Sequence, residues 1–218
     1  MRKQYIYSDQ LSLWGERECL GFGSENFYIK EIERDLANDI IVKNHYSKKF
    51  YNATYIHLGL FENEVLKGVL QYGYAMNPAS CGSVVEGTKQ DEYLELNRMW
   101  LCDSIQIKYA ESQAISMSVS YIKKKYPKIK WIQSFADERC GGFGIVYQAC
   151  SFSYYGEHNS IFWELNGQVY HNSLMTRNPK LSKSAKLIQE NKDNAISYNL
   201  RQFRYIKFLD SRWKKKCL

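Results

Sequence analysis

The stretch Trp131–Gly156 constrains the fold more than any other part of this sequence. It opens with a short apolar and aromatic run, residues 131–136, which is typical of a buried strand. Asp137 follows at the expected carboxyl end of that strand, where open α/β sheets place their chemistry. A glycine-rich turn at 141–144 and a short helix pattern at 145–149 come next, before a returning strand at 152–156. This order predicts a site-building unit of an α/β sheet, although an ordinary connection with a tight turn fits the same pattern.

The patterns around this stretch predict the rest of the sheet. Strands are expected at residues 26–30, 55–61, 65–74 and 93–101 and in a last hairpin of 160–165 and 168–172, and helices at 31–45 and 109–126. Residues 1–20 are expected to form a loosely organised lead-in, 62–64 a hairpin turn, and 77–90 a loop. Three consecutive antiparallel strands that lead into a strand-helix-strand crossover predict an α/β fold. Its mixed, mostly antiparallel central sheet is expected to have helices on both faces.

Length and composition exclude several classes of protein. At 218 residues the chain is long enough for one domain with a core of its own. No stretch approaches the ~20 apolar residues of a membrane span, and the N-terminal residues lack the apolar run of a signal peptide. Six cysteines are scattered without a CxxC pair, which indicates neither a zinc ribbon nor a disulfide framework. These features predict a cytoplasmic protein without a membrane partner, and they make no prediction about its oligomeric state.

Positive charge is concentrated in the last fifth of the chain. Residues 177–218 hold 12 Lys and Arg against 3 Asp and Glu, a net charge of +9, whereas residues 1–176 hold 18 against 20, a net charge of −2. Aromatic side chains interleave with these charges at Tyr198, Phe203, Tyr205, Phe208 and Trp213. Because Lys and Arg gain affinity by releasing counterions from phosphates, this basic C-terminal extension is expected to contact a nucleic acid. A solubilising tail is the simpler alternative.

Short motifs across residues 40–160 carry a resemblance to a known family. They are, in order, His45-Tyr46-Ser47, Glu95-Leu96-Asn97-Arg98-Met99-Trp100, Glu111-Ser112, Ser134-Phe135-Ala136-Asp137, Gly142-x-Gly144-x-x-Tyr147-Gln148-Ala149 and Gly156. The element order resembles the acyl-CoA N-acyltransferase fold, known as the GNAT fold. The motifs within it resemble more specifically the Mom family of bacteriophage DNA-modification proteins. Residues 1–176 are then expected to be a GNAT-like catalytic domain, and 177–218 an extension that contacts DNA.

The resemblance implies a function. It implies an enzyme that adds a methylcarbamoyl- or carbamoylmethyl-type group to the exocyclic N6 of adenine in DNA, by which a phage shields its genome from restriction enzymes. The partner would be double-stranded DNA with the target adenine flipped out of the stack. The family's proposed cofactor is acetyl-CoA, and iron has been implicated as well. No H-x-E or H-x-x-x-H spacing supports a metal site here, so the metal ligands stay open.

The cofactor loop of ordinary GNAT enzymes is missing from this sequence. Their fourth strand leads into a glycine-rich loop whose backbone amides hold the pyrophosphate of CoA. The corresponding segment here, residues 104–114, contains no glycine. Ser112 and the beginning of the long helix remain as expected phosphate ligands.

Four residues are expected to be catalytic. Asp137 is expected to accept a hydrogen bond or proton from the adenine amine, and its alternative role is to cap a turn. Tyr147 matches the tyrosine with which GNAT enzymes often protonate the departing thiolate, whereas core packing is the alternative. His45 and Tyr46 are included because of the motif match, since a lone histidine is more often structural than catalytic.

Further residues are expected to bind the cofactor or the DNA. The cofactor-binding candidates are Arg98, Ser112, Gly142 and Gly144. The DNA-binding candidates are Glu95, Asn97, Phe143, Lys214, Lys215 and Lys216. A guanidinium fork suits phosphate or carboxylate, although Arg98 with Glu95 could instead form a structural ion pair. Ser112 could equally be a helix-cap residue.

Two other functions fit parts of the sequence. One is a small-molecule or protein N-acetyltransferase, the function most proteins of this fold have, against which the glycine-poor loop and basic tail argue. The other is a non-catalytic DNA-binding module, against which Asp137 and Tyr147 argue.

Overall fold

The computed structural model describes residues 4–11, 17–172 and 183–216. The chain divides into two compact units. Unit 1 comprises residues 1–134, 146–153 and 206–218, and unit 2 comprises residues 135–145 and 154–205. Each unit is described by itself. Three strands run from one unit into the other.

Unit 1 is built on a sheet of seven strands. They are β1 (Gln4–Leu11), β2 (Arg17–Ser24), β3 (Phe27–Glu31), β4 (Thr54–Glu62), β5 (Val65–Gly73), β6 (Tyr93–Leu101) and the beginning of β7 (Trp131–Asp137). They are hydrogen-bonded in the order β1-β2-β3-β4-β5-β6-β7. All neighbours are antiparallel except β6 and β7, which are parallel. The predicted mixed, mostly antiparallel sheet is therefore confirmed.

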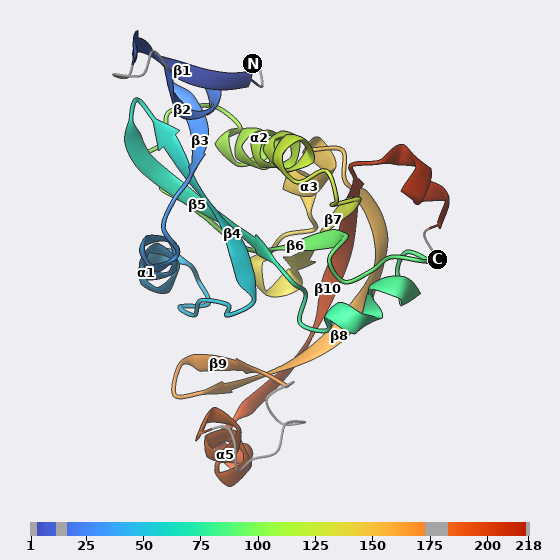
Figure 1. The fold of residues 1–218 in the computed structure, drawn as a ribbon. Coiled ribbons are helices and arrows are strands. Elements are labelled where there is room, and N and C mark those ends of the chain that lie inside the picture. The colour runs from blue at the N-terminus through green and yellow to red at the C-terminus, as the bar shows by residue number, and fades with distance from the viewer. Residues whose placement is uncertain (1–3, 12–16, 173–182, 217–218) are drawn as a thin grey trace. The chain divides into compact units, whose positions relative to one another are not determined.

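Two helices cover the two faces of this sheet (Figure 1). Helix α1 (Arg34–Asn44) packs Ala37 and Ile41 against Val69 of β5. Helix α2 (Ala110–Lys125) lies on the other face, where Ser118 hydrogen-bonds the hydroxyl of Tyr72, three residues beyond Val69 on the same strand. Side chains an odd number of positions apart on a strand point to opposite faces, so the two helices enclose the strand between them.

Unit 2 contains a smaller antiparallel arrangement. Its strands β8 (Ser153–Leu165), β9 (Gln168–His171) and β10 (Ile196–Phe208) are ordered β10-β8-β9, and helix α5 (Lys183–Glu190) adds Ile188 to a core with Leu165 and Tyr170. The predicted turn at Asn166-Gly167 is confirmed. Both residues have positive φ, 52° and 73°, as a two-residue hairpin turn requires.

Two expected irregular regions are strands. The first 20 residues were expected to be a loose lead-in, but β1 and β2 pair there, and Tyr5 packs edge-on against Phe22 at 5.2 Å between ring centroids. The register shift between Ile6 and Tyr7 interrupts the alternation by which a strand is recognised in sequence.

The C-terminal segment departs further from the expected structure. Residues 196–208 form β10, in which Phe203 and Tyr205 are buried. Their alternation with basic residues is therefore the two-residue period of a strand, and not that of a solvated tail. The basic residue Lys207 also belongs to the folded structure, because its Nζ donates to the carbonyl oxygens of Cys150 (3.0 Å) and Ser151 (3.2 Å).

Smaller differences concern connections. The turn between β4 and β5 has two residues, Asn63 and Glu64, rather than three, and both have positive φ. The expected loop at 77–90 contains a 3-10 helix, η1 (Pro78–Ser83). Strand β8 is continuous where two strands were expected, at 152–156 and 160–165. Across the described ranges, none of the helices combines the length and apolar character needed to cross a membrane.

Candidate functional site

Strand β6 carries a bulge at the centre of unit 1. Gln71 of β5 lies opposite Arg98, but the next residue, Tyr72, lies opposite Leu96, so Asn97 is the extra residue. A bulge shifts the alternation of the strand, and it therefore places Glu95 and Arg98 on one face. Beside them, the parallel pairing of β6 with β7 ends at Glu95–Gln133, although both strands continue.

A polar network joins these strands. The Glu95 carboxylate accepts a hydrogen bond from Asn97 Nδ2 at 3.0 Å on Oε1 and from Gln133 Nε2 at 2.8 Å on Oε2. Asn97 Nδ2 also donates to the carbonyl oxygen of Tyr74. Glu95 and Asn97 were expected from the sequence. Gln133 was missed, and its only signal is a polar residue inside an apolar strand pattern.

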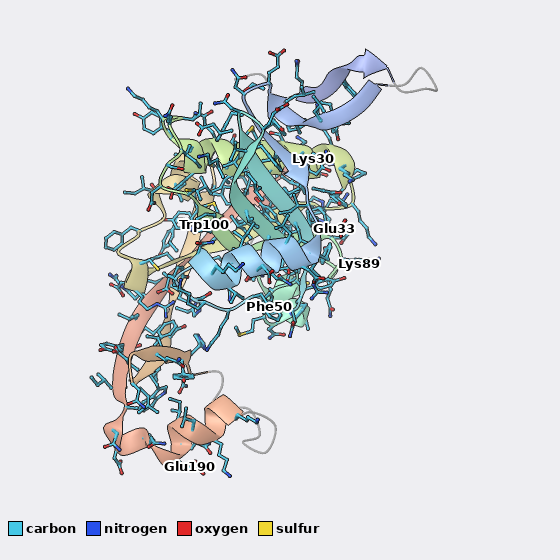
Figure 2. All side chains as sticks on the ribbon, turned by 90° about the vertical axis from the view of Figure 1, so that its left-hand side faces the viewer. Lys30, Glu33, Phe50, Lys89, Trp100 and Glu190 are labelled. Atoms are coloured by element: carbon cyan, nitrogen blue, oxygen red, sulfur yellow. The ribbon has the colours of Figure 1, made fainter. Side chains whose placement is uncertain are left out.

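Arg98 is held by the loop that follows α1. Its Nε donates to the carbonyl oxygen of Lys49 at 3.1 Å, its Nη1 donates to that of Asn97, and its guanidinium lies 5.9 Å from the ring centre of Tyr51. Figure 2 looks onto the face of unit 1 that α1 covers, with Trp100 of β6 and Phe50 of this loop labelled beside the helix. The structure thus brings the expected arginine together with the loop of the His45 motif.

His45 and Tyr46 lie at the end of α1. His45 is buried, and its Nδ1 accepts a hydrogen bond from the backbone N–H of Ser47 at 3.1 Å and lies 2.8 Å from the Ser47 hydroxyl. The Tyr46 ring lies 4.1 Å from the imidazole, centroid to centroid, and is 57% exposed. His45 therefore closes the helix locally, while Tyr46 presents an aromatic surface to solvent.

Ser112 and Tyr147 lie in unit 1 on the two helices expected from the sequence. Ser112 is in the first turn of α2, and its hydroxyl donates to the carbonyl oxygen of Tyr109 at 3.0 Å. Its own carbonyl oxygen accepts from Cys150 Sγ at 3.1 Å, which links α2 to the end of α3 (Ile145–Ala149). Tyr147 on α3 is half-buried, with its ring centre 5.7 Å from that of Phe152.

In unit 2, Asp137 ends β7 and begins the 3-10 turn η2 (Glu138–Cys140). Its Oδ1 accepts from the backbone N–H of Arg139 at 3.0 Å, and its Oδ2 lies 3.3 Å from Arg139 Nη2. The alternative role as a turn cap is thus present in the structure. It does not exclude acid-base chemistry, because a carboxylate has further lone pairs.

The glycine turn after Asp137 is fixed by Tyr205 of β10. The Tyr205 hydroxyl donates to the carbonyl oxygen of Phe143 at 2.5 Å, and the Tyr205 ring lies so close to Gly144 that a Cβ there would meet it at 2.2 Å. In the described ranges of the chain, nothing lies within 4 Å of a Cβ built on Gly142. Phe143 is 56% exposed. The turn therefore presents an aromatic ring and an open backbone on a rigid support.

The three lysines Lys214–Lys216 form the end of the 3-10 helix η5 (Ser211–Lys216) and are exposed. The carbonyl oxygen of Lys216 accepts from the backbone N–H of Glu86 at 2.8 Å, and its Nζ lies 4.4 Å from the centre of the Trp213 ring. The backbone of the triplet is anchored in unit 1, and its side chains face solvent. Among the described residues, no group of three or more His, Cys, Asp or Glu is arranged to hold a metal ion.

A second buried network lies under α1. Gln71 Nε2 donates to Asn38 Oδ1 at 2.9 Å and lies 3.2 Å from His57 Nδ1. An amide nitrogen can only donate, so Nδ1 must accept and the imidazole is neutral. Burial lowers the pKa of His57, with Arg34 acting in the same direction.

This network makes stability depend on pH. A histidine whose pKa is lower in the folded protein stabilises the fold above the unfolded pKa of about 6.5, and this stability is lost as the pH falls below it. We expect His57→Gln to flatten the decline in the free energy of unfolding between about pH 7 and pH 5, measured by urea titration. His158 and His171, whose pKa values burial also lowers, would account for the remaining slope. An unchanged slope in the variant would contradict this.

The fold defines the class of protein. Arabidopsis thaliana NAA60 in complex with acetyl-CoA matches with a TM-score of 0.52 and 9% identity, over 84% of this chain and 99% of that one. An N-acetyltransferase from Staphylococcus aureus Mu50 matches with a TM-score of 0.50 and 14% identity, over 85% of this chain and 99% of that one. The protein yncA of Salmonella typhimurium, with its cofactor acetyl-CoA, matches with a TM-score of 0.50 and 10% identity, over 85% of this chain and 95% of that one. The chain has the acyl-CoA N-acyltransferase (GNAT) fold.

The sequence comparisons narrow this class to a family. The model of the Mom protein family matches residues 26–218. The methylcarbamoylase mom of Escherichia phage Mu is 43% identical over 215 residues, which cover 99% of this chain and 89% of the phage Mu protein. The chain therefore belongs to the Mom protein family, and the resemblance drawn from its motifs is confirmed.

Proposed function

We propose that this protein is a transferase that adds a methylcarbamoyl- or carbamoylmethyl-type group to the exocyclic N6 amine of adenine in double-stranded DNA. The observation that carries the proposal is 43% identity, along 99% of the chain, to a phage enzyme named as a methylcarbamoylase. The fold supports a group transfer to nitrogen, since its structural relatives include an N-acetyltransferase. In a phage, the modification would protect the genome from restriction.

Acetyl-CoA or a related acyl-CoA is the proposed cofactor. Helix α2 begins at Ala110, and the side chain of the preceding Tyr109 does not cap it, so its first amides suit a phosphate, with Ser112 in the same turn. Arg98 would add a guanidinium. Because residues 104–114 contain no glycine, the helix start would replace the usual glycine loop. When bound, the cofactor supplies an activated acyl group.

The chain's own residues have proposed roles in positioning and proton transfer. The adenine amine is a poor nucleophile because its lone pair is delocalised into the ring, so Asp137 would accept its proton. The base must leave the stack to be reached, and the exposed ring of Phe143, in the same unit as Asp137, is available to stack on it. The Tyr147 hydroxyl would give a proton to the leaving group, and His45 would keep Tyr46 in place.

The test is to express the protein in a bacterium, digest the cellular DNA to nucleosides and weigh the deoxyadenosines by mass spectrometry. A heavier deoxyadenosine, absent from cells with the empty vector, is expected. Unmodified deoxyadenosine together with acetylated small amines or proteins would favour an N-acetyltransferase instead. DNA binding without any modification in the presence of acetyl-CoA would favour a binding module.

The lysine triplet supplies a prediction about DNA affinity. Replacing Lys214, Lys215 and Lys216 with Ala should weaken binding to all sequences and reduce the slope of log affinity against log salt by up to ~0.9 for each lost phosphate contact. Fluorescence anisotropy at several salt concentrations measures the slope. Lys123→Ala, an exposed lysine at the end of α2, is the control whose slope should stay nearer the wild type. A triplet variant with the wild-type slope would show that these lysines do not contact the backbone.

A further inference from the structure

Glu95 fixes the orientation of two neighbouring amides. A carboxylate only accepts hydrogen bonds, so Asn97 and Gln133 must each turn an amide nitrogen toward it, as the distances of 3.0 and 2.8 Å show. The two amides occupy different oxygens of the same carboxylate. Their carbonyl oxygens, Asn97 Oδ1 and Gln133 Oε1, are consequently turned away from Glu95.

These two oxygens are buried and have no hydrogen-bond partner among the residues that the structure describes. Gln133 as a whole is 5% exposed. Leaving a buried acceptor unsatisfied costs about 1–3 kcal/mol, and folded proteins leave few such groups. The two oxygens belong to amides joined through one carboxylate, one on a β-bulge and one where the parallel pairing of β6 and β7 ends. They point to a donor from outside the described part of the chain.

We propose that Asn97 Oδ1 and Gln133 Oε1 form an acceptor pair for the two N–H groups of an exocyclic amine on a nucleobase, with Glu95 as the positioning residue. The inference rests on the proposed function, and it assigns to Gln133 a role in choosing the base. The two N–H groups of the unreacted amine satisfy both acceptors when the base is recognised, before the amine gives up a proton in the transfer step. A base without the amine leaves them unpaired, and a keto oxygen in the same place is repelled. Because the side chains are neutral amides, this selectivity is independent of the charge-driven affinity for the DNA backbone.

The test compares single-stranded oligonucleotides that differ at one central base, which is adenine, purine or hypoxanthine. The wild type is expected to bind the adenine strand about 10-fold more tightly than the purine strand, as one or two satisfied acceptors imply, and the hypoxanthine strand least. Gln133→Met keeps the side chain's length and removes one of the two acceptors, so the preference for adenine over purine should fall to what Asn97 Oδ1 alone provides. Glu95→Gln should lose the same preference although both amide oxygens remain, because the amides are then free to turn.

Gln71→Met is the matched control. Gln71 is also a buried strand glutamine with an unpartnered Oε1, but it lies in the network with His57 and not with Glu95. Its variant should keep the preference for adenine. Circular dichroism and thermal unfolding establish that each variant is folded. Should Gln133→Met fail to fold, Asn97→Ala at the half-buried bulge replaces it, with the same expectation.

The outcomes separate this inference from the proposed function. A wild type that modifies deoxyadenosine but binds all three strands equally overturns the acceptor pair and leaves the function standing. The same holds if Gln133→Met or its replacement keeps the full preference for adenine, in which case the buried oxygens are satisfied by water. A wild type that prefers the adenine strand but leaves cellular deoxyadenosine unmodified supports the acceptor pair and overturns the proposed chemistry.

Discussion

Asp137→Asn is expected to lower the rate of DNA modification by about 10²–10⁴-fold, the usual effect of removing a positioned acid-base group. The substitution keeps the shape of the side chain and removes its charge. The fold should persist, because asparagine caps a turn as well as aspartate does and retains the oxygen that accepts from the Arg139 backbone. DNA affinity should persist as well. Mass spectrometry of deoxyadenosine after a timed reaction measures the rate.

The structure adds a control that separates catalysis from turn formation. Arg139→Gln removes the charged partner of Asp137 at 3.3 Å while leaving its backbone N–H in place. If Asp137 acts through its own carboxylate, the arginine variant should lose far less activity than Asp137→Asn. Normal modification by Asp137→Asn would show that the acid only shapes the turn and that the chemistry lies elsewhere.

The second large effect is expected from Gly144→Ala, which should destabilise unit 2 and abolish its turn. Gly144 has φ +75°, and a Cβ there would lie 2.2 Å from the ring of Tyr205. A positive φ alone costs a non-glycine residue about 1–2 kcal/mol. The collision adds to this, because the Tyr205 hydroxyl is anchored on the Phe143 carbonyl and the ring cannot simply move aside. The free energy of unfolding from urea titration measures the loss.

Substitutions of two other glycines in the same turn separate the cost of the positive φ from the cost of the collision with Tyr205. Gly141 has φ +68°, but no described atom lies within 4 Å of a built Cβ, so Gly141→Ala should show the conformational cost alone. Gly142 has neither a positive φ nor an atom close to a built Cβ among the described residues, so Gly142→Ala should leave the free energy of unfolding near that of the wild type. Any loss of modification in that variant would then indicate that cofactor or DNA approaches the backbone closely. Equal stability of all three variants would refute the role of Tyr205.

The fold was largely predictable from the sequence because its helices and central strands have clear periods. Strand β10 was not predictable in this way, since its basic composition is typical of a tail although Phe203 and Tyr205 recur with the period of a strand. The motifs located Glu95, Asn97 and Arg98, but not what brings them together. That depends on the bulge at Asn97, which is a property of the pairing of β6 with β5 and is absent from either strand alone. Gln133 was missed for the same reason, because its importance follows from lying opposite Glu95.

The hydroxyl of Tyr205 and the carbonyl of Phe143, which it holds, are separated by 62 positions in the chain. At about 5–20 residues per second, the ribosome needs several seconds to synthesise the chain between them. During that interval the glycine turn has already emerged but lacks its anchor. The nascent protein would therefore acquire this turn only after β10 has been translated, so a chain interrupted before that strand should be without DNA-modifying activity.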